Sequence, residues 1–186
     1  NTALGRQALD ANSTGADNTA VGHDALGSNT TGSNNTAVGE QALLVNTTGA
    51  QNTSVGANAL DASTTADNNT AIGYAALSAN TGGTQNTAVG SRSLLSNTTG
   101  LDNTAVGMDA LYSNTTGSKN VAVGQNALEA NNATGNVAVG YNALLLNTTG
   151  ADNTAVGYVA LDANTTASNC TAIGYAALSA NTGGSS

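Results

Sequence analysis

The chain has 186 residues, a formal net charge of −8 and an aromatic content of 3%, with no Trp, Phe or Pro. So few large side chains cannot fill the single core of an ordinary globular domain of this length. The excess of acidic residues argues against binding to nucleic acid or to an anionic membrane surface, since binding phosphates or anionic lipids needs clustered Lys and Arg. No apolar run approaches the length of a transmembrane helix, and no signal-peptide pattern opens the sequence.

A repeat of seventeen residues fills the sequence, written eleven times with one residue missing from the eighth copy. The copies begin at Asn1, Asn18, Asn35, Asn52, Asn69, Asn86, Asn103, Asn120, Asn136, Asn153 and Cys170. We call each copy a rung and number its positions from 1 to 17. A unit this short buries too little surface to fold alone, so neighbouring rungs must stack on one another. The sequence therefore predicts a single repeat array over residues 1–186.

The first predicted element of each rung is a short strand over positions 2 to 4, with the sequence Thr-Ala-Val in most copies. Val121 and Val137 stand at position 2, where the other rungs have Thr. Because Thr and Val are nearly isosteric and β-branched, this exchange favours an inward-facing position 2, with position 4 on the same side. Thr2 and Leu4 are thus expected to face the interior. The predicted core residues at position 4 are Leu4, Val21, Val38, Val55, Ile72, Val89, Val106, Val123, Val139, Val156 and Ile173.

A second short strand is predicted over positions 8 to 11, around a constant Leu at position 9. Position 11 is small or apolar in every rung, whereas position 10 ranges from Asp to Tyr, so positions 9 and 11 are expected to pack and position 10 to face solvent. The predicted core residues at position 9 are Leu9, Leu26, Leu43, Leu60, Leu77, Leu94, Leu111, Leu128, Leu144, Leu161 and Leu178.

Turns are expected after each strand, at the Gly of position 5 and in the Asn-Thr-Thr-Gly segment of positions 12 to 15. A helix over the Gly-x-x-Ala-Leu segment is the alternative, but the glycines and β-branched residues leave no window long enough for a stable one. The predicted fold is all-β: a parallel β-roll or β-solenoid in which residue i pairs with residue i+17. Eleven rungs at about 4.8 Å give a rod of about 50 Å.

Stacking in register also places identical side chains above one another. We expect Asn at positions 1 and 12 and Thr at position 13 to form hydrogen-bonded ladders along the rod. The short eighth copy is expected to absorb its missing residue in the loop around Asn132, Ala133 and Thr134.

Each rung offers one Val or Ile, one Leu and a few small residues, so a single coil is marginal. A solvent-facing column of position 9 leucines would be an apolar stripe that a soluble monomer rarely exposes. Parallel chains closing around a threefold axis would hide that stripe, which favours a homotrimer. A self-assembling filament of single solenoids is the alternative, because uncapped strand edges template end-to-end stacking.

The Asn-Thr-Ala-Val-Gly and Asn-Thr-Ala-Ile-Gly segments followed by Ala-Leu resemble the repeats in the heads of trimeric autotransporter adhesins, and also the arrays of phage tail-fibre and bacterial fibre proteins. The resemblance extends over the whole sequence. It implies a parallel β-roll assembled as a trimer, with Thr2 and Leu4 at the family's two inward-facing positions and Gly5 ending the strand. It further implies an extracellular shaft or adhesive segment, on a cell surface or virion, with a host-surface or matrix ligand.

Enzyme activity is not expected, because a uniform rod repeats the same groups at every level and catalysis needs different groups converging in a pocket. His23 is the sole histidine and Cys170 the sole cysteine, so neither has a repeated partner for catalysis or metal binding. The recurring acids Asp17, Asp67 and Asp102 lack the phasing of calcium-binding rolls. We therefore expect no cofactor and no metal.

Two further hypotheses concern the surface. Asn-Thr-Thr forms a glycosylation sequon at position 12 of several rungs, although a turn ladder is the simpler interpretation. Rows of outward Thr at positions 13 and 14 would suit an ice-binding solenoid, although Gly82 and Ala133 interrupt them. The variable tyrosines are candidate contacts for a partner, to which the sequence assigns no site: Tyr74, Tyr112, Tyr141, Tyr158 and Tyr175.

Overall fold

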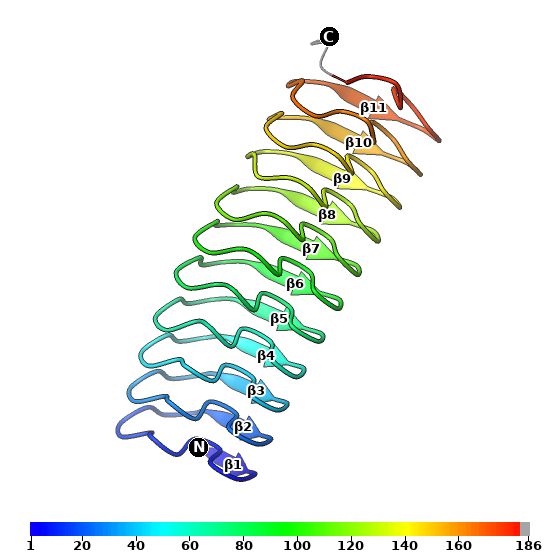
Figure 1. Cartoon of the computed structure of the whole chain (residues 1–186). Helices are drawn as coiled ribbons and strands as arrows, with labels where there is room; N and C mark the ends of the chain where they lie inside the picture. The colour runs from blue at the N-terminus through cyan, green and yellow to red at the C-terminus, as the bar shows by residue number, and fades with distance from the viewer. Residues whose placement is uncertain (183–186) are drawn as a thin grey trace.

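A computed structural model describes residues 1–182, and the last four residues of the final predicted rung, 183–186, lie outside the described part. The described chain is a parallel β-solenoid, a rod in which each rung forms one flat coil and the N-terminal and C-terminal rungs lie at opposite ends (Figure 1). Eleven strands of three residues form one sheet in chain order. They are β1 (Thr2–Leu4), β2 (Thr19–Val21), β3 (Thr36–Val38), β4 (Thr53–Val55), β5 (Thr70–Ile72), β6 (Thr87–Val89), β7 (Thr104–Val106), β8 (Val121–Val123), β9 (Val137–Val139), β10 (Thr154–Val156) and β11 (Thr171–Ile173).

The strands pair in parallel at the spacing of the repeat. Thr19 pairs with Thr36, seventeen residues further on, and the same offset holds along the rod. Between β8 and β9 the offset falls to sixteen, because Val121 pairs with Val137. The predicted stacking of one copy on the next is confirmed.

The predicted second strand is wrong. Positions 6 to 11 form a series of turns in which positions 7 and 9 are left-handed, as at Asp24 (φ 56°) and Leu26 (φ 51°). Their amides bond in opposite directions: Asp24 N donates to Arg6 O of the previous rung, and Leu26 N to Ala42 O of the next. Because positions 7 and 9 are left-handed, this segment lacks the regular pleat of a strand, although the Leu of position 9 still points into the interior. No helix occurs in residues 1–182.

The interior is narrow, and Ala lines it at positions 3 and 8 together with the Leu of position 9. Nine of the predicted core leucines are fully buried: Leu26, Leu43, Leu60, Leu77, Leu94, Leu111, Leu128, Leu144 and Leu161. In the terminal rungs, Leu9 is only partly buried and Leu178 is exposed. The leucines therefore pack within one coil, and a leucine stripe on the outside, which favoured the trimer, does not exist.

The predicted core at position 4 is also wrong. In the strands the central residue is buried and its neighbours are not, so Ala points inward and positions 2 and 4 point outward. The exchange of Thr for Val at position 2 reflects a half-exposed sheet face, which β-branched residues suit as well as a core. All the position 4 residues named above are at least partly exposed: Leu4, Val21, Val38, Val55, Ile72, Val89, Val106, Val123, Val139, Val156 and Ile173.

Two ladders of buried asparagine stabilise the coil from inside, as the sequence predicted. At position 1, the side-chain oxygen of Asn18 accepts from the backbone N–H of Asn35 at 2.9 Å. At position 12, Asn46 Nδ2 donates to Asn29 Oδ1 at 2.8 Å. Asn35 Nδ2 and Asn46 Nδ2 both donate to the carbonyl of Gly49, at 2.8 and 3.0 Å, so the two ladders are joined in each coil.

The position 12 ladder is interrupted at Ser63 and in the eighth rung. Ser63 stands where other rungs have Asn, and it leaves both its own hydroxyl and Asn46 Oδ1 buried without a partner. In the eighth rung, Asn131 donates to Ala133 O but does not reach Asn114, whose Oδ1 is also unpaired. A change of residue or of length in one rung therefore costs a hydrogen bond in the rung before it.

The short eighth copy loses its residue at position 14, within the loop the sequence indicated. Asn120 Nδ2 donates to Ala133 O, the bond that other rungs make to position 15. The side-chain oxygen of Asn132 accepts from the amides of Thr115 and Thr116, both at 2.9 Å. In other rungs a backbone carbonyl of position 13 accepts these bonds, so the Asn132 amide substitutes for it.

Candidate interaction surface

The outer face of the sheet is a regular surface that extends from the first rung to the last. It consists of two columns, position 2 and position 4 of the strands β1 to β11, and we call it the threonine-valine face. Position 2 is Thr or Val and position 4 is Val, Ile or Leu in all eleven rungs, so neither column contains an ionisable side chain. Away from the ends, Ile72 and Val106 are still 40% and 37% exposed. The face is thus an uncharged, partly apolar strip along the rod.

The threonines of this face differ from those of position 13. Most position 13 hydroxyls donate to the next rung, as Thr30 Oγ1 does to Thr47 O at 2.9 Å and Thr98 Oγ1 to Thr115 O at 3.0 Å. Within residues 1–182, no bond from a position 2 hydroxyl to another protein group is found. The position 13 row, which the ice-binding hypothesis invoked, is therefore committed to the coil, and the position 2 row is available to solvent or to a partner.

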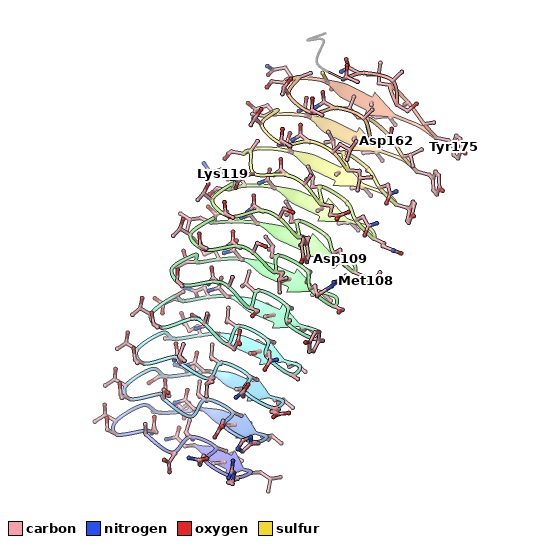
Figure 2. All side chains as sticks on the ribbon, in the orientation of Figure 1. Met108, Asp109, Lys119, Asp162 and Tyr175 are labelled. Carbon is pink, nitrogen blue, oxygen red and sulfur yellow. The ribbon has the colours of Figure 1, made fainter. Side chains whose placement is uncertain are left out.

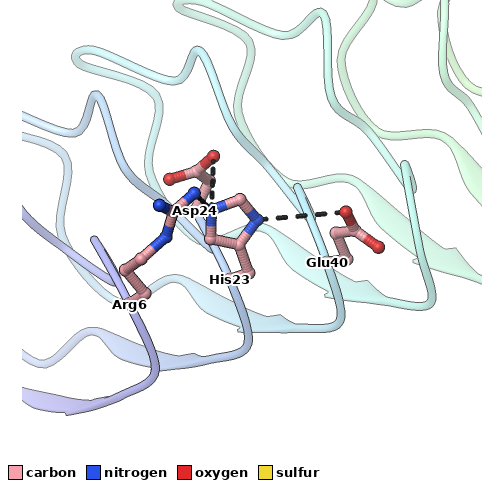
Figure 3. A network of polar contacts seen from close by, with 4 residues as sticks. All are labelled: Arg6, His23, Asp24 and Glu40. Carbon is pink, nitrogen blue, oxygen red and sulfur yellow. Dashed lines mark hydrogen bonds and ion pairs between the residues drawn. The ribbon is translucent and has the colours of Figure 1, made fainter.

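Position 6 forms the edge of the rod beyond Gly5, at the carboxyl ends of the strands, where Met108 and Tyr175 project from the tips of the coils (Figure 2). In the first rungs this edge is charged: Arg6 contacts the His23 ring, and His23 Nε2 and Nδ1 lie 3.3 Å from Asp24 and 3.9 Å from Glu40 (Figure 3). His23 is therefore part of a surface ladder of polar contacts, which the sequence alone did not reveal.

In the last rungs the same edge is aromatic. Tyr141, Tyr158 and Tyr175 stack along the rod with ring centroids 5.1 and 5.3 Å apart and interplanar angles of 17° and 5°. We call these three residues the tyrosine ladder. The spacing of seventeen residues between them is the signal that finds it in the sequence.

A mixed cluster lies at the middle of the rod. Arg92 donates to Asp109 Oδ2 at 2.6 Å, and its guanidinium lies 5.4 Å from the ring centroid of Tyr112. Asp109 is buried and its Oδ1 has no partner within the described chain. The cluster joins two successive rungs and needs no ligand to explain it.

The described residues offer little that resembles a catalytic or metal centre. An open depression of about 230 Å³ near the N-terminal end contains Asp10 and Asp24, beside the space left by Gly27 at position 10. In residues 1–182 no group of three or more His, Cys, Asp or Glu side chains is placed to hold a metal ion. None of the described segments is a helix long and apolar enough to cross a membrane. Cys170 is buried and not disulfide-bonded.

The sequon asparagines are not accessible in the folded rod. Each is buried and takes part in the position 12 ladder: Asn29, Asn46, Asn97, Asn114, Asn147 and Asn164. Glycosylation at these amides would require the coil to open, because their Nδ2 atoms donate into the interior.

Comparison with models of known families, with curated proteins and with solved structures finds no match to this chain.

Proposed function

We propose that this chain is a rigid shaft segment of an extracellular fibre, assembled from parallel copies that bury their threonine-valine faces against one another. The uncharged strip along the whole sheet is the single observation on which the proposal depends. A strip of partly exposed Val and Ile this long is unusual on a soluble monomer and typical of a surface that meets another chain.

A second copy of the same chain is a suitable partner for the threonine-valine face, because both chains then have the same rung spacing. Each Val of one copy then meets an apolar residue of the other at every level, and no charge is buried. A threefold closure around the strips gives every copy the same environment, and it agrees with the resemblance to trimeric adhesin heads and tail fibres. A ligand on a host surface or matrix would bind elsewhere on such a fibre, because the assembly covers the strip.

The molar mass in solution tests the proposal. We expect residues 1–186 to sediment as a species of about three times the chain mass of 17.9 kDa. The double variant Ile72→Lys and Val106→Lys should reduce it to the single-chain mass, because two charges would be buried in the strip. Leu101→Lys is the matched control, since Leu101 is 40% exposed at position 16 and lies off the strip.

Three outcomes oppose the proposal. A wild-type chain that stays a monomer at high concentration contradicts it. Masses that grow with concentration without a fixed number of chains would support the filament of single solenoids instead. Loss of assembly in both the double variant and the Leu101→Lys control would show that added charge, and not the strip, is responsible.

Ice binding is a second candidate for the same face. The position 2 hydroxyls are unpaired within residues 1–182, and they alternate with methyl-bearing side chains in an uncharged, regularly spaced array. Ice binding requires the threonine-valine face to be exposed and not covered by another chain. Thermal hysteresis in the wild type that Ile72→Lys with Val106→Lys abolishes, together with a monomeric mass, would favour ice over self-association.

A further inference from the structure

The tyrosine ladder is the largest exposed aromatic group of the described chain. Tyr141, Tyr158 and Tyr175 are 39%, 49% and 79% exposed, and they occupy the same position in three successive rungs. Exposed aromatic side chains in a row are costly on a free surface and are enriched at the centres of protein interfaces.

The surface around the ladder is uncharged, unlike the same surface at the other end. In the three rungs that contain the ladder, positions 1 to 7 include no Asp, Glu, Lys, Arg or His. In the first three rungs, positions 6 and 7 contain Arg6, His23, Asp24 and Glu40. The threonine-valine face is therefore extended by an aromatic edge at the C-terminal rungs and bounded by a charged edge at the N-terminal rungs.

The geometry of the rings limits what they can bind. Tyr158 is stacked on both faces, and Tyr141 and Tyr175 are stacked on one face each, so between the rings the edges and hydroxyls face outward rather than the ring faces. A sugar, which packs flat on an exposed ring face, does not fit this arrangement along the ladder. Ring edges and hydroxyl groups instead suit the side of another protein, in which aromatic edges meet aromatic faces or apolar side chains.

We infer that the tyrosine ladder is the anchor of the contact between copies of this chain, and that it aligns them in parallel. The inference rests on the proposed self-association through the threonine-valine face, with which the ladder is continuous: Gly157 alone separates Val156 from Tyr158. The partner is a second copy of this chain, whose own ladder offers aromatic edges at the same rung spacing.

Parallel alignment follows from the contrast between the two ends. In a parallel pair the two ladders meet at the same level, where no charge lies on the edge. In an antiparallel pair each ladder would lie beside Asp24 and Glu40, whose carboxylates would lose water against aromatic rings. The single Arg6 does not offset two acids, and its guanidinium already contacts His23.

The first test replaces all three ladder tyrosines with Ser, the residue that occupies position 6 naturally at Ser91. We expect the dissociation constant of the assembly to rise at least tenfold, since hot-spot aromatic residues typically have effects of this size. Tyr74→Ser is the matched control, because Tyr74 is 58% exposed at position 6 but has Ala57 and Ser91 as its neighbours. Changing the three tyrosines to Phe should leave association near the wild-type value.

An unchanged dissociation constant in the triple Ser variant, together with dissociation of the Ile72→Lys and Val106→Lys variant, would overturn the anchor and leave the proposed function standing. A wild type that does not associate would instead overturn the proposed function. Circular dichroism confirms that each variant retains the solenoid.

The second test measures orientation by spin labels at Ala16→Cys and Ala151→Cys, both at position 16, with Cys170 replaced by the Asn of the other rungs. In a parallel assembly, labels at the same site on different chains lie close together at both ends. In an antiparallel one, labels at different sites lie close and same-site labels separate by up to about 38 Å, eight rungs at about 4.8 Å. The antiparallel result overturns the inference.

Discussion

The interior of each coil and its outer edge differ in how much the residue type varies from rung to rung. Inside, Asn at positions 1 and 12, Ala at position 3 and Leu at position 9 recur with few exceptions. At the edge, position 6 changes from Arg6 through Ala57 to Tyr175. Each interior side chain is bonded or packed to the rungs before and after it, so one residue type fits every level. Edge side chains contact nearby surface residues, as His23 contacts Arg6 and Asp24, which leaves their chemistry free to vary along the rod.

We therefore expect the interior residues to determine the stability of the rod and the surface residues to determine its assembly. Interior substitutions should then lower the free energy of unfolding without a specific effect on association. Edge and face substitutions should change association and leave unfolding nearly unchanged. An interior substitution that changes association, or a surface substitution that changes unfolding by a similar amount, would contradict this division.

The largest effect is expected for Asn103→Ala. Asn103 Nδ2 donates to Gly117 O at 2.9 Å, and its Oδ1 accepts from the backbone and side chain of Asn120, at 3.0 and 3.1 Å. Removing the amide leaves the buried N–H of Asn120 unpaired and removes the side-chain bonds to Gly117 O and to Asn120 Nδ2, so we expect a loss of about 3 to 5 kcal/mol in the free energy of unfolding. Urea denaturation followed by circular dichroism measures it.

Asn126→Ala is the control for this change. Asn126 lies at position 7, outside the coil, and donates one bond to Asn142 at 3.1 Å. Its loss should cost about 1 kcal/mol or less. Similar losses at both sites would contradict the claim that the interior ladders dominate stability.

A smaller but still large effect is expected for Gly39→Ala at position 5. Gly39 has φ of +137°, and a Cβ there would lie 2.6 Å from the carbonyl oxygen of Gly56 in the next rung. Because both the left-handed backbone and the close approach oppose a side chain, we expect a loss of about 2 to 4 kcal/mol, measured by thermal or urea unfolding.

Gly32→Ala at position 15 tests the same substitution at a site without a positive φ, where a Cβ would lie 2.3 Å from the carbonyl oxygen of Gly49. Position 15 is already Ala at Ala66 and Ala167, where the coil closes with the same asparagine bonds, so the coil can shift to admit a methyl group there. We expect a loss of about 1 to 2 kcal/mol, smaller than at Gly39. If Gly32→Ala were as costly as Gly39→Ala, the positive φ at position 5 would not be the cause.

The fold was predictable because its signal is periodic. The offset of seventeen fixes which residues stack, and the recurring Asn and Thr then indicate the ladders. The facing of the strand was mistaken because a three-residue strand contains too little alternation to identify its buried side. Position 3 held the missing clue: it is Ala in every rung except for Ser54, as small as a narrow interior requires.

The turn over positions 6 to 11 was not predictable from residue preferences. Leu26 adopts a left-handed backbone that costs about 1 to 2 kcal/mol for such a residue. Stacking offsets this cost, because the same conformation buries Leu26 fully and directs its amide to Ala42 of the next rung. The conformational preference of a single residue takes no account of a hydrogen-bond partner sixteen residues away in the sequence. The surface sites were missed for the same reason, since stacking alone brings Tyr141 and Tyr158 together.

Completing the interrupted position 12 ladder should stabilise the rod. Ser63→Asn places an amide between Asn46 and Asn80, where Asn46 Oδ1 is buried without a partner. The new Nδ2 can donate to Asn46 Oδ1 and to Ala66 O, as the equivalent groups do at Asn29 and Gly32. We expect a gain of about 1 to 2 kcal/mol, measured by urea unfolding.

Ser28→Asn is the control for that gain, because Ser28 lies at position 11, next to the ladder but partly exposed. It should change the free energy of unfolding by less than about 0.5 kcal/mol. A Ser63→Asn variant no more stable than the wild type would mean that the unpaired oxygen of Asn46 is satisfied in another way.

The smallest effect is expected for Arg92→Met at position 7. The change removes the 2.6 Å ion pair with Asp109 and the contact with Tyr112, but keeps the apolar stem that packs along the coil. Arg92 is about half exposed, so the pair is screened, and we expect a loss of about 1 kcal/mol or less that shrinks further in high salt. Urea unfolding at two salt concentrations measures both. A loss as large as that of Asn103→Ala would place part of the rod's stability on its surface, because the buried Asp109 would then depend on Arg92 as strongly as the interior amides depend on one another.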